Sequence, residues 1–150
     1  MKPIFIAILL AAGVLQAEEY DSEYMCLAKS IYFEAGNQNL LGKLAVAKVI
    51  LNRVAATDYP NSICGVVHQY KQFSWYSDGK SDKPKEEDAW RLSLEATDHI
   101  LFGETPEARV FEDPSIKWYH ADYANPKMVA WTSNLNRVDK LGAHIFYSDR

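Results

Sequence analysis

Helical periodicity dominates the first two thirds of the chain. Between residues 22 and 35, Leu27, Ile31 and Glu34 fall on one stripe of a 3.6-residue period, which predicts a helix with one buried face. Residues 41–54 are apolar nearly all round, a pattern typical of a helix at the centre of a core. The sequence therefore predicts an amphipathic helix followed by a central, buried one.

A polar loop over residues 77–85 precedes a third predicted helix. This helix has Pro84 in its first turn, acidic residues at its start that suit the helix dipole, and Gly103 as its stop. Its apolar positions share one face and are Ala89, Leu92, Ala96 and Ile100.

After the third predicted helix the pattern changes to short apolar segments typical of strands. Residues 109–111, 118–120 and 144–147 are predicted strands, and residues 126–131 a helical turn. No repeat or interdomain linker separates the helices from the strands. The predicted fold is therefore a single α+β domain, with a helical body and a small antiparallel sheet.

The N-terminal segment is predicted to lie outside this domain. Lys2 and the apolar residues 4–14 have the order of a signal peptide, so residues 1–17 are expected to be removed and residues 18–150 to be exported. The apolar stretch is short for a membrane span, so no stable insertion is expected after cleavage. Because Leu15 is not the small residue preferred before a cleavage site, a weak uncleaved anchor stays an alternative.

Composition narrows the class of partner. The net charge is −4 and no basic patch is visible, which argues against a nucleic-acid partner. The aromatic content of 13%, with nine Tyr and four Trp, suits a cleft for sugars or peptides, although core filling accounts for most aromatic residues.

The chain has two cysteines, Cys26 and Cys64. An even number in an exported chain predicts a disulfide, and two buried thiols are the alternative. Closing a loop of this length would stabilise the fold by roughly 4 kcal/mol in the chain-entropy model.

Glu34 is the residue that most clearly indicates chemistry. A carboxylate on an apolar stripe is costly unless it is paired, protonated or used. Gly36 predicts a helix end just after Glu34, where burial and the negative end of the helix dipole both disfavour the anion. The expected result is a raised pKa, as a general acid needs near neutral pH. A structural Glu held by a neighbouring Arg or Lys is the alternative.

Other familiar chemistries lack their motifs. The sequence has no G-x-S-x-G, P-loop, Rossmann glycine pattern or H-E-x-x-H. His120, Asp122 and His144 include metal-binding residue types, but their spacing matches no tight signature, so no metal or cofactor is expected. A Cys/His nucleophilic pair would be lost if both cysteines are bridged.

Several motifs lie in order along residues 26–147. They are Cys26-x-x-x-x-Ile31-Tyr32-Phe33-Glu34-Ala35, Gly42-x-x-Ala45-Val46-Ala47-x-Val49-Ile50-Leu51-Asn52-Arg53-Val54, Tyr59-Pro60-x-x-Ile63-Cys64-x-Val66-Val67, Gln72-Phe73-Ser74-Trp75-Tyr76-x-Asp78-Gly79, Tyr119-His120-Ala121, Pro126, and Gly142-x-His144-x-Phe146-Tyr147. This ordered set resembles the cell-wall hydrolase family of the spore-cortex lytic enzymes.

The resemblance implies a mostly helical, lysozyme-related or transglycosylase-like domain that cuts the glycan strands of peptidoglycan. Glu34 falls on the family's catalytic glutamate, and a lytic transglycosylase would use it first as acid and then as base, leaving a 1,6-anhydro-muramyl end. The same match implies a glycan groove, with packing as the alternative role for each residue and favoured for Phe73. The implied groove residues are Gln72, Phe73, Ser74, Tyr119 and His120.

Two departures from the family pattern stand out. Many relatives read Glu-Ala-Arg-Gly-Glu where this chain has Gly36-Asn37-Gln38 after Ala35, so an Arg and a second acid are missing, and Arg53 is a candidate to replace the Arg. Relatives often have cysteines where this chain has Lys71 and Ser77. The loss of that pair leaves the two remaining cysteines as partners.

Three alternatives to a transglycosylase stay open. A hydrolytic muramidase on the same scaffold would need Asp113 or Asp122 to help activate water. A non-catalytic peptidoglycan-binding protein would use the aromatic residues for binding alone. An amidase or peptidase acting on the stem peptide would require a metal. In the leading interpretation the chain is an exported monomer of the periplasm or cell wall, either for wall remodelling or as a phage-type lysis enzyme (an endolysin).

Overall fold

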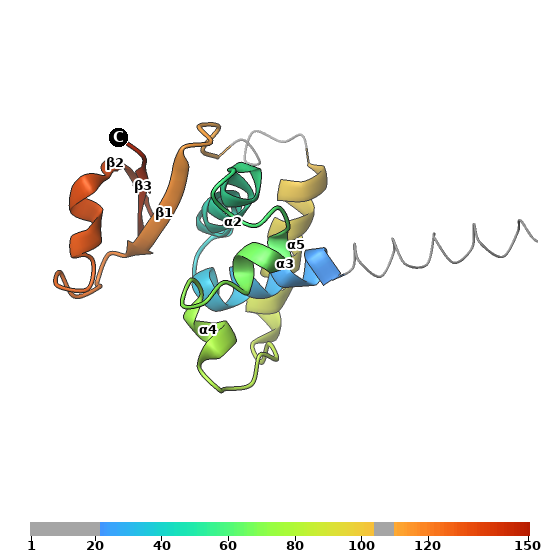
Figure 1. Ribbon diagram of the computed structural model, residues 1–150. Helices are drawn as coiled ribbons and strands as arrows, with labels where there is room; N and C mark the ends of the chain where they lie inside the picture. Colours follow the sequence, from blue (N-terminus) through green and yellow to red (C-terminus); the bar gives the residue numbers. More distant parts are fainter. Residues whose placement is uncertain (1–21, 104–109) are drawn as a thin grey trace, which may run out of the picture.

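The computed structural model describes residues 22–103 and 110–150 (Figure 1). The predicted signal peptide, residues 1–17, lies outside the described residues. A helix over residues 22–35, here the N-terminal helix, begins the described part. The elements after it are α2 (Leu40–Ala55), α3 (Ile63–Val67), α4 (Ser74–Ser77), α5 (Glu87–Phe102), β1 (Ile116–Ala121), the 3₁₀ helix η2 (Ala130–Asn134), β2 (Asn136–Leu141) and β3 (His144–Ser148). The predicted α+β class is confirmed.

Helix α2 lies at the centre of the molecule, as its apolar sequence predicts. Asn39 caps its start, because its side-chain oxygen accepts a hydrogen bond from the backbone N–H of Gly42 at 3.0 Å. One side of α2 packs against the other helices through Leu44 and Ile50. Another side packs against the sheet, where Val46 belongs to a cluster that β3 also enters. Helix α2 therefore joins the helical body to the sheet.

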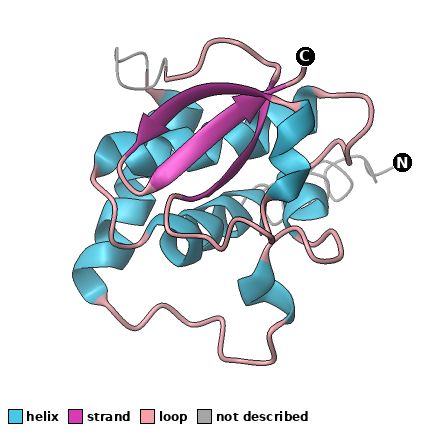
Figure 2. Cartoon of the chain, turned by 90° about the vertical axis from the view of Figure 1, so that its left-hand side faces the viewer, coloured by secondary structure: helices cyan, strands magenta, loops and turns pink. Residues whose placement is uncertain are grey.

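The sheet has three antiparallel strands in the order β1-β3-β2 and lies across one side of the helices (Figure 2). Tyr119 pairs with Phe146, and Ala121 pairs with His144, at the β1–β3 ladder. Residues directly opposite each other in an antiparallel pair project to the same face. Phe146 is fully buried in the cluster against α2, so this face of β1 and β3 looks toward the helices.

The sheet corrects two predictions. The predicted strand 109–111 is wrong at Val110 and Phe111, which lie in a turn because Phe111 has a left-handed backbone (φ +51°). The ring of Phe111 nevertheless packs on the ring of Phe146, with the two centroids 4.8 Å apart. Residue 109 lies outside the described residues. Strand β2 was not predicted, because its residues are almost all exposed and show no apolar alternation. The helical turn lies at Ala130–Asn134, a little later than predicted.

Helix α5 begins later than predicted, at Glu87, so Pro84 is not in its first turn. The backbone N–H groups of Lys85 and Glu86 both donate to the Tyr32 hydroxyl at 3.0 Å, which holds this segment extended. The fully buried positions of α5 are Ser93, Ala96 and Thr97. Its predicted apolar face is only partly buried at Ala89, Leu92 and Ile100.

The predicted disulfide between Cys26 and Cys64 is present, with the two Cα atoms 5.3 Å apart. It ties the N-terminal helix to α3. The Glu23 carboxylate reinforces this link by accepting hydrogen bonds from the backbone N–H groups of Ile63 and Cys64. In the described part of the chain, every helix is too short or too polar to span a bilayer.

Candidate active site

A cleft of about 290 Å³ opens where the end of the N-terminal helix meets the start of α4 and the β1–β3 edge of the sheet. All six site residues expected from the resemblance line it. They come from segments far apart in the sequence and meet only through the fold. The lining residues are Phe33, Glu34, Arg53, Gln72, Phe73, Ser74, Tyr119, His120, Ala121, Tyr123 and His144.

Glu34 lies in the last turn of the N-terminal helix, as predicted. A Cβ at Gly36 would lie 2.6 Å from the carbonyl oxygen of Tyr32, so glycine fits this helix end where a side chain would clash. The Lys43 ammonium donates to the carbonyl oxygens of Ala35 at 2.8 Å and of Gly36 at 3.0 Å. Lys43 is fully buried, and burial lowers its pKa to about 8. The backbone beside Glu34 is therefore fixed from α2.

The Glu34 carboxyl is partly buried and receives a hydrogen bond from the Tyr119 hydroxyl to Oε2 at 3.0 Å. Burial raises the pKa of Glu34, and this effect outweighs the Tyr119 hydrogen bond and the Arg53 charge, which both lower it. The prediction of a raised pKa is confirmed, with burial as the main cause.

Arg53 at the end of α2 organises one wall of the cleft. Its Nε donates to the carbonyl oxygen of Lys117 at 2.8 Å, and its Nη1 donates to Oε1 of Gln72 at 3.2 Å. The guanidinium also lies over the ring of Phe73, 5.7 Å from its centroid. Arg53 therefore hydrogen-bonds Gln72 and forms no ion pair with Glu34, although its charge still lowers the pKa of Glu34.

Gln72, Phe73 and Ser74 divide into two kinds. Gln72 and Ser74 are exposed at the cleft, whereas Phe73 is only 2% exposed and belongs to the helical core. A side chain so deeply buried has little surface to offer a ligand, so its position fits the packing role that the sequence favoured.

The two histidines of the cleft differ in their partners. His120 Nε2 lies 2.8 Å from the Tyr147 hydroxyl, and His120 Nδ1 lies 2.8 Å from the carbonyl oxygen of Ala121. His144 is buried, and its Nδ1 has no hydrogen-bond partner among the described residues. Burial is the main cause that lowers the pKa of His144. The charge of Asp122 raises this pKa, and His120 lowers it further. Sequence reasoning named His144 in a motif and considered it as a metal ligand, but did not assign it to the site.

Glu34 is the only carboxylic acid among the described residues that line the cleft. Asp122 forms an ion pair with Lys140 at 2.7 Å, and Asp113 accepts a hydrogen bond from the backbone N–H of Ser115 at 2.8 Å. Neither acid lines the cleft, so the structure gives no support to a second carboxylate that activates water. Within the described ranges, no group of three or more His, Cys, Asp or Glu side chains is placed to hold a metal ion.

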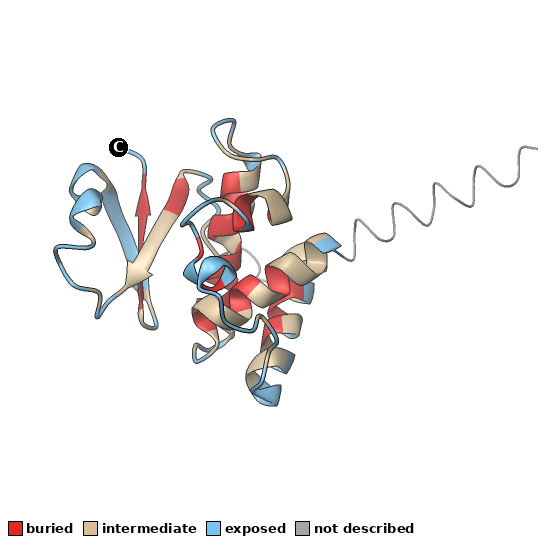
Figure 3. Cartoon of the chain, turned by 60° about the horizontal axis from the view of Figure 1, so that its bottom comes forward, coloured by how far each residue is buried: buried red, intermediate tan, exposed pale blue. Residues whose placement is uncertain are grey.

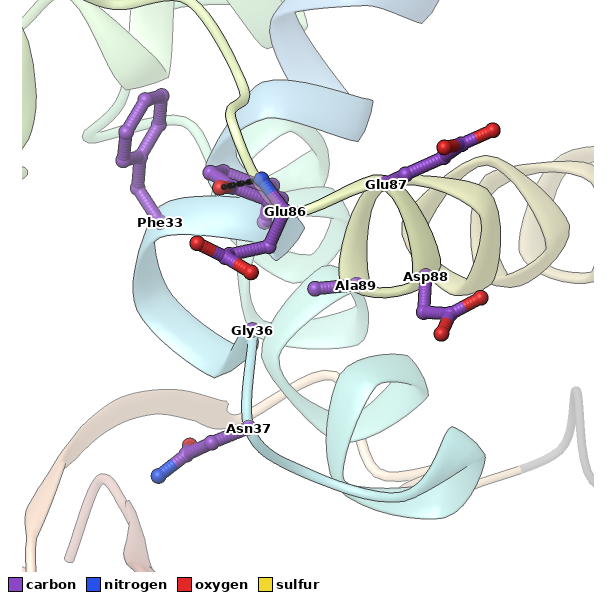
Figure 4. A pocket seen from close by; sticks show the side chains of 8 residues that line it. Phe33, Gly36, Asn37, Glu86, Glu87, Asp88 and Ala89 are labelled. Atoms are coloured by element: carbon purple, nitrogen blue, oxygen red, sulfur yellow. Dashed lines mark hydrogen bonds between the residues drawn. The ribbon is translucent and has the colours of Figure 1, made fainter.

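A larger hollow of about 790 Å³ lies between the end of the N-terminal helix and the start of α5 (Figure 4). Phe33 lines both this hollow and the cleft. The acidic residues that line the larger hollow are all exposed, so none of them is buried as Glu34 is. They are Glu86, Glu87 and Asp88. Chemistry rather than size therefore selects the smaller cleft as the candidate active site.

Known proteins are similar to this chain over most of its length. A model of the family described as Cell Wall Hydrolase matches residues 37–147, beginning just after Glu34. A spore cortex-lytic enzyme of Bacillus cereus is 30% identical over 125 residues, which cover 83% of this chain and 44% of that protein. A spore cortex-lytic enzyme of Halalkalibacterium halodurans is 28% identical over 84% of this chain and 34% of its own length. The chain thus spans less than half the length of these curated relatives.

Solved structures extend the similarity to the fold. The catalytic domain of the germination-specific lytic transglycosylase SleB from Bacillus anthracis matches with a TM-score of 0.59 and 29% identity, over 84% of this chain and 93% of that domain. The catalytic domain of the Bacillus cereus SleB protein matches with the same TM-score and identity, over 85% of this chain and 91% of that domain.

Proposed function

Because this chain belongs to the cell wall hydrolase family, we propose that it cleaves the β-1,4 bond between N-acetylmuramic acid and N-acetylglucosamine in peptidoglycan as a lytic transglycosylase. One observation carries the proposal. Among the described residues, the cleft presents a single carboxyl group, that of Glu34, with a raised pKa and a hydrogen bond to one of its two oxygens.

The first step uses Glu34 as an acid. Since Tyr119 donates to Oε2, the proton of the neutral carboxyl group resides on Oε1. Glu34 gives this proton to the glycosidic oxygen while the bond from that oxygen to the anomeric carbon breaks. Burial keeps Glu34 protonated closer to neutral pH than a free carboxyl group would be.

The second step uses the same residue as a base. The C6 hydroxyl of the muramyl sugar attacks its own anomeric carbon, and the Glu34 carboxylate takes the hydroxyl proton. A 1,6-anhydro ring forms, the acid is regenerated and no water is consumed. Most glycosidases need two carboxyl groups about 5–10 Å apart, and a cleft with one fits this intramolecular route better.

The neighbouring side chains would hold the glycan. The Gln72 carbonyl accepts from Arg53, which leaves the amide hydrogens to bind sugar oxygens. The Ser74 hydroxyl is exposed beside it. The Tyr119 hydroxyl orients the acid. His120 contributes mainly its ring, because both of its nitrogens already have partners within the protein.

The proposal includes export to the periplasm or cell wall and action as a monomer. The disulfide between Cys26 and Cys64 supports an oxidising compartment, since such bonds persist mainly outside the cytoplasm.

The test is a digest of purified sacculi with wild type and Glu34→Gln, followed by mass spectrometry of the released muropeptides. We expect products that lack one water at the muramyl end, and a loss of activity of about a thousandfold or more in the variant. Products with reducing ends alone would indicate a hydrolase. Pelleting of wild type with sacculi without any cleavage would indicate a binding protein.

A further inference from the structure

His144 is held firmly at the cleft by the turn that precedes it. The backbone N–H of Ala143 donates to Oε1 of Gln38 at 2.9 Å, and the carbonyl oxygen of Ala143 accepts from the backbone N–H of Asp122 at 2.8 Å. The Tyr119 ring meets the imidazole edge-on, with the centroids 5.2 Å apart. Only 6% of His144 is exposed. The ring therefore has a fixed place next to the tyrosine that holds Glu34.

The imidazole lacks the internal hydrogen bonds that a buried histidine normally makes. Its Nδ1 is sealed from solvent and has no partner among the described residues, whereas both nitrogens of His120 are satisfied. Buried polar groups are rarely left unpaired, and an unpaired N–H is rarer than an unpaired lone pair. Nδ1 of His144 therefore keeps its lone pair, and the proton of the neutral ring resides on Nε2.

The direction of Nε2 follows from the same contrast. His144 lines the cleft. Of its two ring nitrogens, only Nδ1 is both inaccessible to solvent and without a hydrogen-bond partner among the described residues, so we infer that Nε2 is the nitrogen that faces the cleft. An N–H group that faces a substrate cleft and has no protein partner is suited to donate a hydrogen bond to a ligand oxygen. On an uncharged glycan, the strongest acceptors are the amide carbonyls of the N-acetyl groups.

We propose that His144 is a specificity-determining residue that donates from Nε2 to the N-acetyl carbonyl of a sugar beside the scissile bond. This assignment rests on the proposed function. A site built to hydrogen-bond one substrate group discriminates against analogues that lack it, because the protein group is then left unpaired. His144 would thus direct the enzyme toward N-acetylated glycan and against de-N-acetylated wall.

Two isosteric variants separate the ring nitrogens. The amide nitrogen of Gln lies near the position of histidine Nε2, whereas that of Asn lies near Nδ1. We expect His144→Gln to retain more of the wild-type kcat/KM than His144→Asn and His144→Phe, which should each lose about tenfold to a hundredfold. His99→Gln on α5, outside the cleft, is the matched control and should match wild type. Thermal unfolding checks that each variant is folded.

The decisive measurement repeats the assay on de-N-acetylated sacculi. The difference between wild type and His144→Phe should disappear on this substrate, because the acceptor is gone. An equal loss on both substrates would overturn acetyl recognition, and so would unchanged kcat/KM of His144→Phe and His144→Asn on native sacculi. If Glu34→Gln is inactive and anhydro products still form, such a result leaves the proposed function standing and removes only this inference.

Discussion

The helical body is buried along several of its helices, whereas the sheet is buried mainly at its central strand β3, and the cleft lies where the two parts meet. Buried positions concentrate in the N-terminal helix, α2 and the central strand β3, whereas most of β2 and of residues 122–135 is exposed (Figure 3). The helical body supplies Glu34, and the sheet supplies Tyr119 and His144. In the proposed mechanism the helical body therefore holds the reacting group, the sheet orients it through Tyr119, and both parts contact the glycan.

Loss of the disulfide should have the largest effect on the helical body. We expect Cys26→Ala/Cys64→Ala to lose roughly 2–4 kcal/mol of the free energy of unfolding, because the unfolded chain gains freedom. Urea unfolding followed by far-UV circular dichroism measures the change. Activity in the cold should persist, since neither cysteine lines the cleft. If the double variant were folded but inactive in the cold, the disulfide would affect the cleft itself and not only the stability of the helical body.

Lys43 tests how strongly the body fixes the end of the Glu34 helix. We expect Lys43→Met to cost about 1–3 kcal/mol at neutral pH, because the carbonyls of Ala35 and Gly36 lose their donor. The pKa of Lys43 is about 8 in the folded protein and 10.5 as the unperturbed value. Between these values the unfolded chain binds more protons, so wild-type stability should rise with pH relative to the variant. If the difference in the free energy of unfolding between wild type and Lys43→Met became smaller from pH 8 to 10.5, this would contradict the burial of the ammonium.

Tyr119→Phe tests the contribution of the sheet. The ring stays, but Glu34 loses a hydrogen bond that lowers its pKa. We therefore expect about a tenfold loss of kcat/KM, and the limb of the pH profile that reports Glu34 should move to higher pH. The pH dependence of sacculus cleavage, measured beside wild type, gives both values. Movement of that limb to lower pH would mean that Tyr119 does not donate to the carboxylate.

The smallest effect is expected at the outer strand. Val138 of β2 is 43% exposed, so Val138→Thr should change the free energy of unfolding by less than about 0.5 kcal/mol. Thermal unfolding and the sacculus assay together check this. A large loss of activity with unchanged stability would show that β2 also touches the substrate.

The same contrast explains what the sequence could predict. The N-terminal helix and α2 follow from their apolar pattern, since their buried faces are wide and mostly apolar. Strand β2 has no such signal, because it depends on main-chain pairing with β3 and little on burial. Phe111 gave a false strand signal because its ring is needed in the core while its backbone turns.

The site followed a similar division. The raised pKa of Glu34 could be predicted from its place on an apolar stripe near a helix end. The hydrogen bond from Tyr119 and the unpaired imidazole of His144 could not, because both depend on how the sheet docks against the helices. No local pattern distinguishes His144 from an ordinary core histidine. Contacts between the helical body and the sheet can be identified only once the three-dimensional structure is known.

Gln38 and Gly142 limit which residues can stand at each other's positions. A Cβ placed on Gly142 would lie 2.0 Å from Oε1 of Gln38, the same oxygen that accepts from Ala143. A side chain at position 142 therefore excludes this contact, so Gly142 can be replaced only together with a change at Gln38. Anyone who grafts the 36–38 segment of a relative onto this scaffold should transfer the β2–β3 turn with it.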